Sequence, residues 1–275
     1  MAEPLAPHPE VEKLKATNAL LRDEVVRLLA EHDHLLQTVR PNLLALYQVK
    51  LGPWELRLLE EQCATARVRR LTEMVQASLN AGRLPDATEI SRKLDAEFAL
   101  WQTRLREAAD KLQAAQRLLA NPMSPAEDLE FKQLYRNLVK LLHPDVAKAD
   151  DGQAAMLWHR VQEAYAATSL TGLRELWELA SQLLPPATSP NSLDTLQEEG
   201  KALSRQVERL AQGIAELQAK PPFDLLEKLE DEAWLKTRRQ EIETQIAALQ
   251  ERRKALEAYL SIIPEVDCAK WLGAN

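Results

Sequence analysis

One stretch decides the fold: Leu129-Glu-Phe-Lys-Gln-Leu-Tyr-Arg-Asn-Leu-Val-Lys-Leu-Leu-His-Pro-Asp-Val146. Its apolar residues recur at steps of three and four, which predicts one buried helix face: Phe131, Leu134, Tyr135, Leu138 and Leu142. Ser124-Pro-Ala-Glu127 is a capping box with proline at the first helical position, so we expect the helix to begin there. Pro144 disfavours helical geometry at His143 and has no N–H, so a rigid turn should follow and display an imidazole and a carboxylate.

The same helix carries a row of basic side chains. Lys132, Arg136 and Lys140 are spaced by four residues and therefore share one face. Taken alone, such a row is most often a solvated helix surface. The functional interpretation of this row depends on its position, because the row leads directly into the His-Pro-Asp turn.

Two further helices are expected after this turn. The second has an apolar face at steps of three and four: Ala154, Leu157, Trp158, Val161, Ala164 and Tyr165. The third continues from Thr171 to Leu184. Because the connection after Asp145 is short and polar, the first two helices should form an antiparallel hairpin with the turn exposed at its tip. We expect Trp158 and Tyr165 to be core residues.

These residues resemble the J domain of DnaJ-type co-chaperones. The matching features are Leu134-Tyr135-Arg136-x-Leu138, then His143-Pro144-Asp145, then Trp158-x-x-Val161-x-x-Ala164-Tyr165. The tripeptide alone is a weak motif, but a helix of the right pattern on each side makes the resemblance specific. It covers the segment from about Ser124 to Leu184, and residues 122–184 are called the J-like unit below.

The resemblance implies a partner and a role for each residue. J domains bind the ATPase of the seventy-kilodalton heat-shock family, DnaK in bacteria, and stimulate its ATP hydrolysis. By resemblance, Asp145 pairs with an arginine of the partner, and His143 and Pro144 shape the turn and touch the partner's interdomain region. The basic row of Lys132, Arg136 and Lys140 would meet an acidic surface. The simpler alternative for Asp145 is a turn former, a common role of aspartate.

Two features depart from the family pattern. The short helix that usually precedes the basic helix is not visible as a separate element, and the end of a long helix near Leu118 and Leu119 is a candidate for its place. The basic cluster that often follows the second helix is also missing. Both departures bear on the strength of the interaction and on the choice of partner.

The composition limits the other classes of function. The 275 residues are rich in Ala, Leu, Glu, Gln, Arg and Lys, with only 7 glycines and no alternating strand pattern, which indicates an all-α protein. A net charge of -7 argues against a nucleic-acid binder. Cys63 and Cys268 suggest neither a disulfide framework nor a metal site and fit a reducing cytoplasm. The first residues are unlike a secretory signal, and no apolar run reaches membrane-spanning length.

We find no pattern typical of an enzyme. The sequence has no glycine-rich phosphate loop, no nucleophile elbow and no paired cysteines, so we expect no catalytic residue, no cofactor and no metal.

Residues 1–40 contain a leucine-zipper-like heptad. One repeat position holds Val11, Asn18, Val25, His32 and Val39, and the other holds Leu14, Leu21, Leu28 and Leu35. Valine at a, leucine at d and one asparagine at a favour a parallel two-stranded coiled coil. We therefore predict a homodimer whose seam contains Leu14, Asn18, Leu21, Val25, Leu28 and Leu35. The alternative is that this helix packs inside its own chain.

The remaining sequence predicts two helical hairpins around the J-like unit. Pro41 should end the zipper helix, and residues 41–121 should form a hairpin whose helices run from about Trp54 to Leu79 and from Asp86 to about Asn121. Residues 185–192 have the composition of a linker. Residues 193–275 should form a C-terminal antiparallel coiled-coil hairpin, broken at Pro221-Pro222-Phe223. The fold expected is thus elongated helical hairpins and coiled coils around the J-like unit.

The function expected is a cytoplasmic co-chaperone. It would bind a DnaK-type chaperone, with client proteins as possible further partners, and would stimulate ATP hydrolysis by the chaperone. The alternative is a coiled-coil scaffold or adaptor whose J-like hairpin no longer activates a chaperone.

Overall fold

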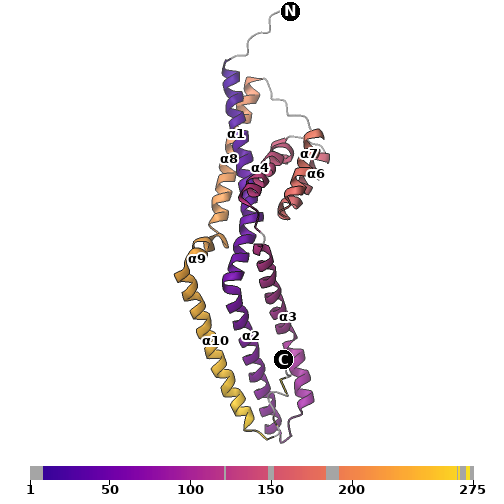
Figure 1. Cartoon of the computed structure of the whole chain (residues 1–275), viewed down its shortest axis with the longest axis vertical. Coiled ribbons are helices and arrows are strands. Elements are labelled where there is room, and N and C mark those ends of the chain that lie inside the picture. Colours follow the sequence, from indigo (N-terminus) through magenta and orange to yellow (C-terminus); the bar gives the residue numbers. More distant parts are fainter. Residues whose placement is uncertain are drawn as a thin grey trace, which may run out of the picture. The chain divides into compact units, whose positions relative to one another are not determined.

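The structure, a computed structural model, describes residues 9–120, 122–147, 152–183, 192–264, 266 and 271–272. Every secondary-structure element in these ranges is helical, which confirms the all-α prediction (Figure 1). In chain order the elements are α1 (Pro9–His34), the π-helical turn η1 (Leu35–Val39), α2 (Arg40–Asn80), α3 (Ala87–Ala120), α4 (Pro125–Leu142), α5 (Pro144–Ala147), α6 (Gly152–Ala166), α7 (Leu170–Leu183), α8 (Leu193–Gln218), the 3-10 turn η2 (Phe223–Leu225), α9 (Leu226–Glu230) and α10 (Glu232–Ser261).

The chain divides into two compact units, each built from segments that are distant in the sequence. Unit 1 contains residues 1–43 and 121–225, and unit 2 contains residues 44–120 and 226–275. One boundary therefore falls inside α2 and another between η2 and α9. Of the predicted linker only Ser192 is described, and Cys268 also lies outside the described residues.

Unit 1 joins the J-like unit to α1 and α8. In Figure 1, α1 and α8 lie side by side over most of their length, and α1 also contacts α4 and α5. The main core is formed by α1, α4, α6 and α7, and its buried residues are Val25, Val26, Leu29, Phe131, Tyr135, Leu138, Val139, Leu142, Ala154, Leu157, Trp158, Val161, Tyr165, Leu173, Leu176 and Ala180.

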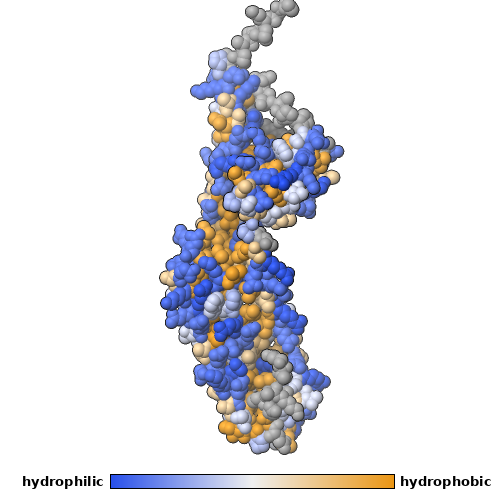
Figure 2. All heavy atoms as spheres, in the orientation of Figure 1, coloured by the Kyte–Doolittle hydropathy of each residue, from blue (hydrophilic) through white to orange (hydrophobic). Residues whose placement is uncertain are grey.

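Unit 2 is built on α2. The predicted hairpin of α2 and α3 is present: Leu71 and Val75 are buried with Ile90 and Leu94. The two helices also share an ion pair between Arg70 and Glu97, 2.8 Å apart. On the face shown in Figure 2, apolar side chains gather along the middle of this unit, where α2 runs, and hydrophilic side chains cover the flanking helices.

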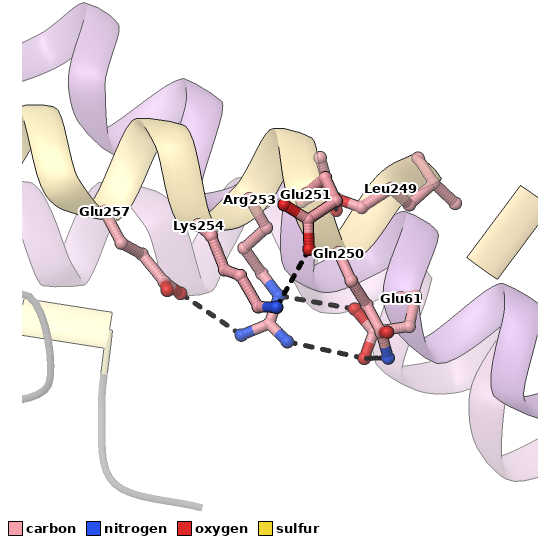
Figure 3. A network of polar contacts seen from close by, with 8 residues as sticks. Glu61, Leu249, Gln250, Glu251, Arg253, Lys254 and Glu257 are labelled. Atoms are coloured by element: carbon pink, nitrogen blue, oxygen red, sulfur yellow. Dashed lines mark hydrogen bonds and ion pairs between the residues drawn. The ribbon is translucent and has the colours of Figure 1, made fainter. Parts of the chain in front are cut away.

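Helix α10 packs along α2 as well. Thr65 donates a hydrogen bond to the Leu249 carbonyl (3.2 Å), and Arg253 Nε lies 3.3 Å from a carboxylate oxygen of Glu61. Figure 3 shows the Arg253 guanidinium between Glu61 of α2 and Glu257 of its own helix, at 3.1 Å from the latter. This arginine therefore links α10 to α2 as well as to the next turn of its own helix.

The prediction that Pro41 ends the first helix is wrong. The chain stays helical from α1 through η1 into α2, and Pro53 also lies inside α2. A proline inside a helix clashes with the carbonyl of the preceding turn and lacks its hydrogen bond. The widened π turn just before Pro41 relieves such a clash, since π-helical turns shift the carbonyl ladder locally.

The predicted C-terminal hairpin also differs from the structure. The break at Pro221–Phe223 is present, but α8 belongs to unit 1 and α10 belongs to unit 2. Each arm has an apolar stripe of its own, and each buries that stripe against an N-terminal helix: α8 against α1, and α10 against α2. An apolar stripe specifies burial, but it does not specify which helix supplies the other side.

Candidate functional site

The start and the end of α4 follow the sequence prediction closely. The Glu127 N–H donates to Ser124 Oγ (3.3 Å), and the Ser124 N–H donates to a Glu127 carboxylate oxygen (2.9 Å), so the capping box is complete. The helix ends at Leu142 because His143 has extended backbone angles (φ −65°, ψ 129°) ahead of Pro144. The basic row and the His-Pro-Asp turn are therefore held on one rigid element.

The turn points its histidine inward and its aspartate outward. His143 is half-buried, and its ring meets Trp158 edge-on with the centroids 4.9 Å apart. Its Nδ1 accepts a hydrogen bond from the Asp145 N–H (3.1 Å), so in the neutral ring the proton is on Nε2. Burial lowers the pKa of His143, and the nearby carboxylates of Asp145 and Asp33 oppose that shift. The side chain of Asp145 is exposed, as is Pro144.

The three basic side chains of α4 have different surroundings. Lys132 pairs with Asp128 one turn earlier (2.7 Å), and Lys140 pairs with Asp23 of α1 (2.6 Å). Arg136 is exposed and has no ion pair within the part of the chain that the structure describes. An exposed ion pair contributes only about 0–1 kcal/mol to stability. Both lysines can therefore leave these aspartates and pair with carboxylates of a partner protein.

A stack of aromatic rings supports the turn from inside. Tyr165 of α6 stacks on Phe131 and Tyr135 of α4, with centroids 4.8 and 3.7 Å apart. Tyr135 also lies beside Trp158 at 6.0 Å. Trp158 and Tyr165 are buried, which confirms the prediction that they are core residues. The start of α4 therefore meets the end of α6, and the end of α4 meets the middle of α6. The two helices are antiparallel, as the predicted hairpin requires.

The fourth side of this core is provided by α1. Val26 and Leu29 of α1 are buried in the core of the J-like unit. Polar contacts reinforce the junction: Tyr135 donates to Asp33 (2.5 Å), and the ring of His34 lies 3.2 Å from the Tyr165 hydroxyl. Sequence reasoning missed this role of α1, although Val26 and Leu29 fall outside the a and d positions and so indicate a second buried face.

The predicted dimer seam is in contact with α8 of the same chain. Val25, Leu28 and Leu35 are buried, and the Asn18 side-chain amide donates to the Leu196 carbonyl (2.8 Å). Leu14 and Leu21 are half-buried at the α1–α8 groove. The two helices run parallel, because the N-terminal part of α1 meets the N-terminal part of α8, and Leu35 near the other end packs with Ile214.

This pairing has the geometry of a parallel coiled coil. Arg22 binds Glu199 at 2.7 Å, and these residues occupy e and g positions of the two heptads. The parallel two-stranded arrangement of the heptad is therefore present, with α8 in the place of a second copy. Whether a homodimer also forms stays a prediction.

Among the described residues no group of three or more histidine, cysteine, aspartate or glutamate side chains is placed to hold a metal ion. None of the helices described is at once long and apolar enough to cross a membrane.

Comparisons with known proteins found no counterpart. No protein-family model, no curated protein and no solved structure matches this chain.

Proposed function

We propose that this protein is a cytoplasmic J-domain co-chaperone that binds a DnaK-type chaperone and stimulates its ATP hydrolysis. One observation carries the proposal: a basic helix, α4, ends at a His-Pro-Asp turn whose histidine packs inward on Trp158 and whose aspartate is exposed. The inward ring supports the turn, and the outward carboxylate is free to meet a cationic group of a partner.

The chemistry of ATP hydrolysis stays in the partner. The exposed row around Arg136 speeds and orients the encounter with an acidic surface, because charges at an interface rim act mainly on association. Asp145 then forms the specific contact. Stimulation follows if the turn binds one conformational state of the chaperone more tightly than the other, since a ligand shifts an equilibrium only by its differential affinity.

The test is steady-state ATP hydrolysis by a DnaK-type chaperone with this protein added. We expect stimulation by the wild type and none by His143→Gln or Asp145→Asn. Asp110→Asn on α3 is the matched control, because Asp110 is also an exposed helical aspartate and lies in the other unit. It should stimulate as the wild type does.

The competing function is a coiled-coil scaffold with an inactive J-like hairpin. It predicts no stimulation by any folded variant, and no recovery of a chaperone ATPase with the wild type in co-purification. Equal stimulation by the wild type and by Asp145→Asn would exclude the proposed use of the turn.

A further inference from the structure

Helix α1 touches the His-Pro-Asp turn from outside the J-like unit. It contacts both α4 and α5, and α5 begins at Pro144. Val25, Val26 and Leu29 are buried in the core beneath the turn. The surroundings of the turn therefore depend partly on α1, which is distant from it in the sequence.

A continuous path of contacts joins this helix to the backbone of the turn. Tyr135 Oη donates to Asp33 Oδ2 at 2.5 Å. The Tyr135 ring lies beside Trp158 with centroids 6.0 Å apart, and Trp158 meets the His143 ring at 4.9 Å. His143 Nδ1 then accepts the Asp145 N–H at 3.1 Å. Each step is a direct contact, from a carboxylate on α1 to the backbone of Asp145.

We propose that Asp33 is a positioning residue for the His-Pro-Asp turn, acting through Tyr135 and Trp158 on His143. The inference rests on the function proposed above, since the turn is taken to be the chaperone-binding element. Tyr135 is almost completely buried, and a buried hydroxyl without a partner is costly, so the Asp33 carboxylate fixes the far end of this ring. The ring in turn limits where Trp158 and His143 can lie, because packed aromatic side chains leave little free volume.

A second contact agrees with this role of α1. Asp23, on the same helix, binds Lys140 in the last turn of α4. The helix therefore engages the basic row near the turn as well as the stack beneath it. Because the Asp23–Lys140 pair is exposed, it serves as an internal reference: changing Asp23 alters a charge on α1 without touching the buried path.

The charged groups that face His143 define the first readout. They are Asp145 in the turn itself and Asp33 from α1, whereas α4 and α6 contribute the neutral side chains of Tyr135 and Trp158. A carboxylate near an imidazole favours its protonated form. Asp33→Asn keeps an acceptor for the Tyr135 hydroxyl but removes the charge, so the His143 pKa should fall.

The first experiment measures that pKa in the full chain by NMR titration of the histidine rings, with His143→Gln used to assign the signal. We expect a lower His143 pKa in Asp33→Asn and an unchanged one in Asp23→Asn. An unchanged His143 pKa in folded Asp33→Asn would mean that the Asp33 carboxylate does not lie near His143, and it would overturn the proposal at its first requirement. This readout requires no chaperone, so it does not depend on the function proposed for the turn.

The second experiment measures chaperone ATPase stimulation. Asp33→Ala and Tyr135→Phe each remove the buried hydrogen bond, and we expect each to raise the half-saturating concentration about 2- to 30-fold, the range that coupled positions of this kind span. Asp33→Asn should restore most of the affinity. If the wild type stimulates and Asp33→Ala matches it, the positioning role is excluded. If the pKa shift is present but the wild type does not stimulate, the chaperone function fails, whereas the placement of the Asp33 carboxylate near His143 stands.

Discussion

At the scale of single residues, two glycines of α8 show how the α1–α8 coil is packed. A Cβ added at Gly200 would lie 2.8 Å from Asn18 Oδ1, whereas one added at Gly213 would meet nothing within 4 Å. Asn18 cannot move aside readily, because it is buried and its amide donates to the Leu196 carbonyl. Gly200 is therefore the residue that lets an asparagine occupy an a position of this seam.

The two glycines give a matched pair of substitutions. Gly213→Ala should stabilise the protein by about 1 kcal/mol, the helix-propensity difference between the two residues. Gly200→Ala should destabilise it by about 1–3 kcal/mol, because the clash with Asn18 outweighs the gain in propensity. Urea unfolding of both variants measures the difference, and a stabilised Gly200→Ala would show that α1 and α8 do not approach so closely.

The histidines of unit 1 predict a dependence of stability on pH. Burial lowers the pKa of both His34 and His143 from the ordinary value of 6.5. A histidine whose pKa is lower in the folded state stabilises the fold above its unfolded pKa, and this contribution is lost as the pH falls through the folded value. The urea midpoint of unit 1 should therefore drop between about pH 7.5 and about pH 5.5.

Histidine variants show whether these two residues cause the drop. The double variant His34→Gln/His143→Gln should lose much of the pH dependence. His159→Gln is the control, because His159 lies on the exposed side of α6, and it should retain the wild-type dependence. Equal slopes in all three proteins would assign the effect to other groups.

At the scale of elements, α1 is a helix with two buried faces. One face meets α8 through Leu28 and Leu35, and the other enters the core of the J-like unit through Val25, Val26 and Leu29. Three helices of the J-like unit alone would leave this core open on one side. The element that completes this core therefore comes from a distant part of the sequence.

A leucine pair on α1 tests this packing. Leu29 is 7 % exposed and Leu20 is 72 % exposed on the same helix. Leu29→Ala should cost about 2–5 kcal/mol of unfolding free energy, the usual range for a buried leucine. Leu20→Ala should change it by less than about 0.5 kcal/mol. Equal costs measured by urea unfolding would mean that α1 does not complete the core.

At the scale of the whole molecule, the heptad of α1 has two possible partners. The sequence predicts a homodimer through this seam, and in the structure α8 of the same chain occupies it. Only one helix can fill the seam at a time. Helix α8 follows the J-like unit, which itself packs on α1, so its effective concentration should exceed the micromolar concentration of a free second copy and the internal pairing should prevail.

Sedimentation of the full chain decides between the two. We expect a monomer at micromolar concentration, and a dimer for a variant that lacks residues 193–225, because its α1 seam is uncovered. A full-length dimer that is lost on deletion of residues 9–39 would instead establish the zipper between two copies.

Much of the fold could be read from local patterns. The capping box at Ser124, the stop at His143 and the aromatic core positions of α4 and α6 all depend on residues within one or two turns, and each appears as predicted. The heptad of α1 was predicted to form a parallel seam with a second copy, whereas in the structure it pairs in parallel with α8 of the same chain. The continuation of the helix through Pro41 was not predicted, because a proline ordinarily ends a helix and the sequence pattern gave no sign of the π turn before it.

Outside the stretch from Pro41 to Pro53, the sequence by itself determined which residues are helical, which faces are apolar, and that a basic helix leads into a His-Pro-Asp turn. These properties follow from short-range sterics, hydrogen bonding and periodicity. Only the tertiary structure decided which faces meet: that α8 fills the seam of α1, that α1 completes the J-like unit, and that Asp33 lies against Tyr135 beneath the turn. One apolar helix face can pack against many other apolar faces. Which two faces pair therefore depends on the packing of the whole chain.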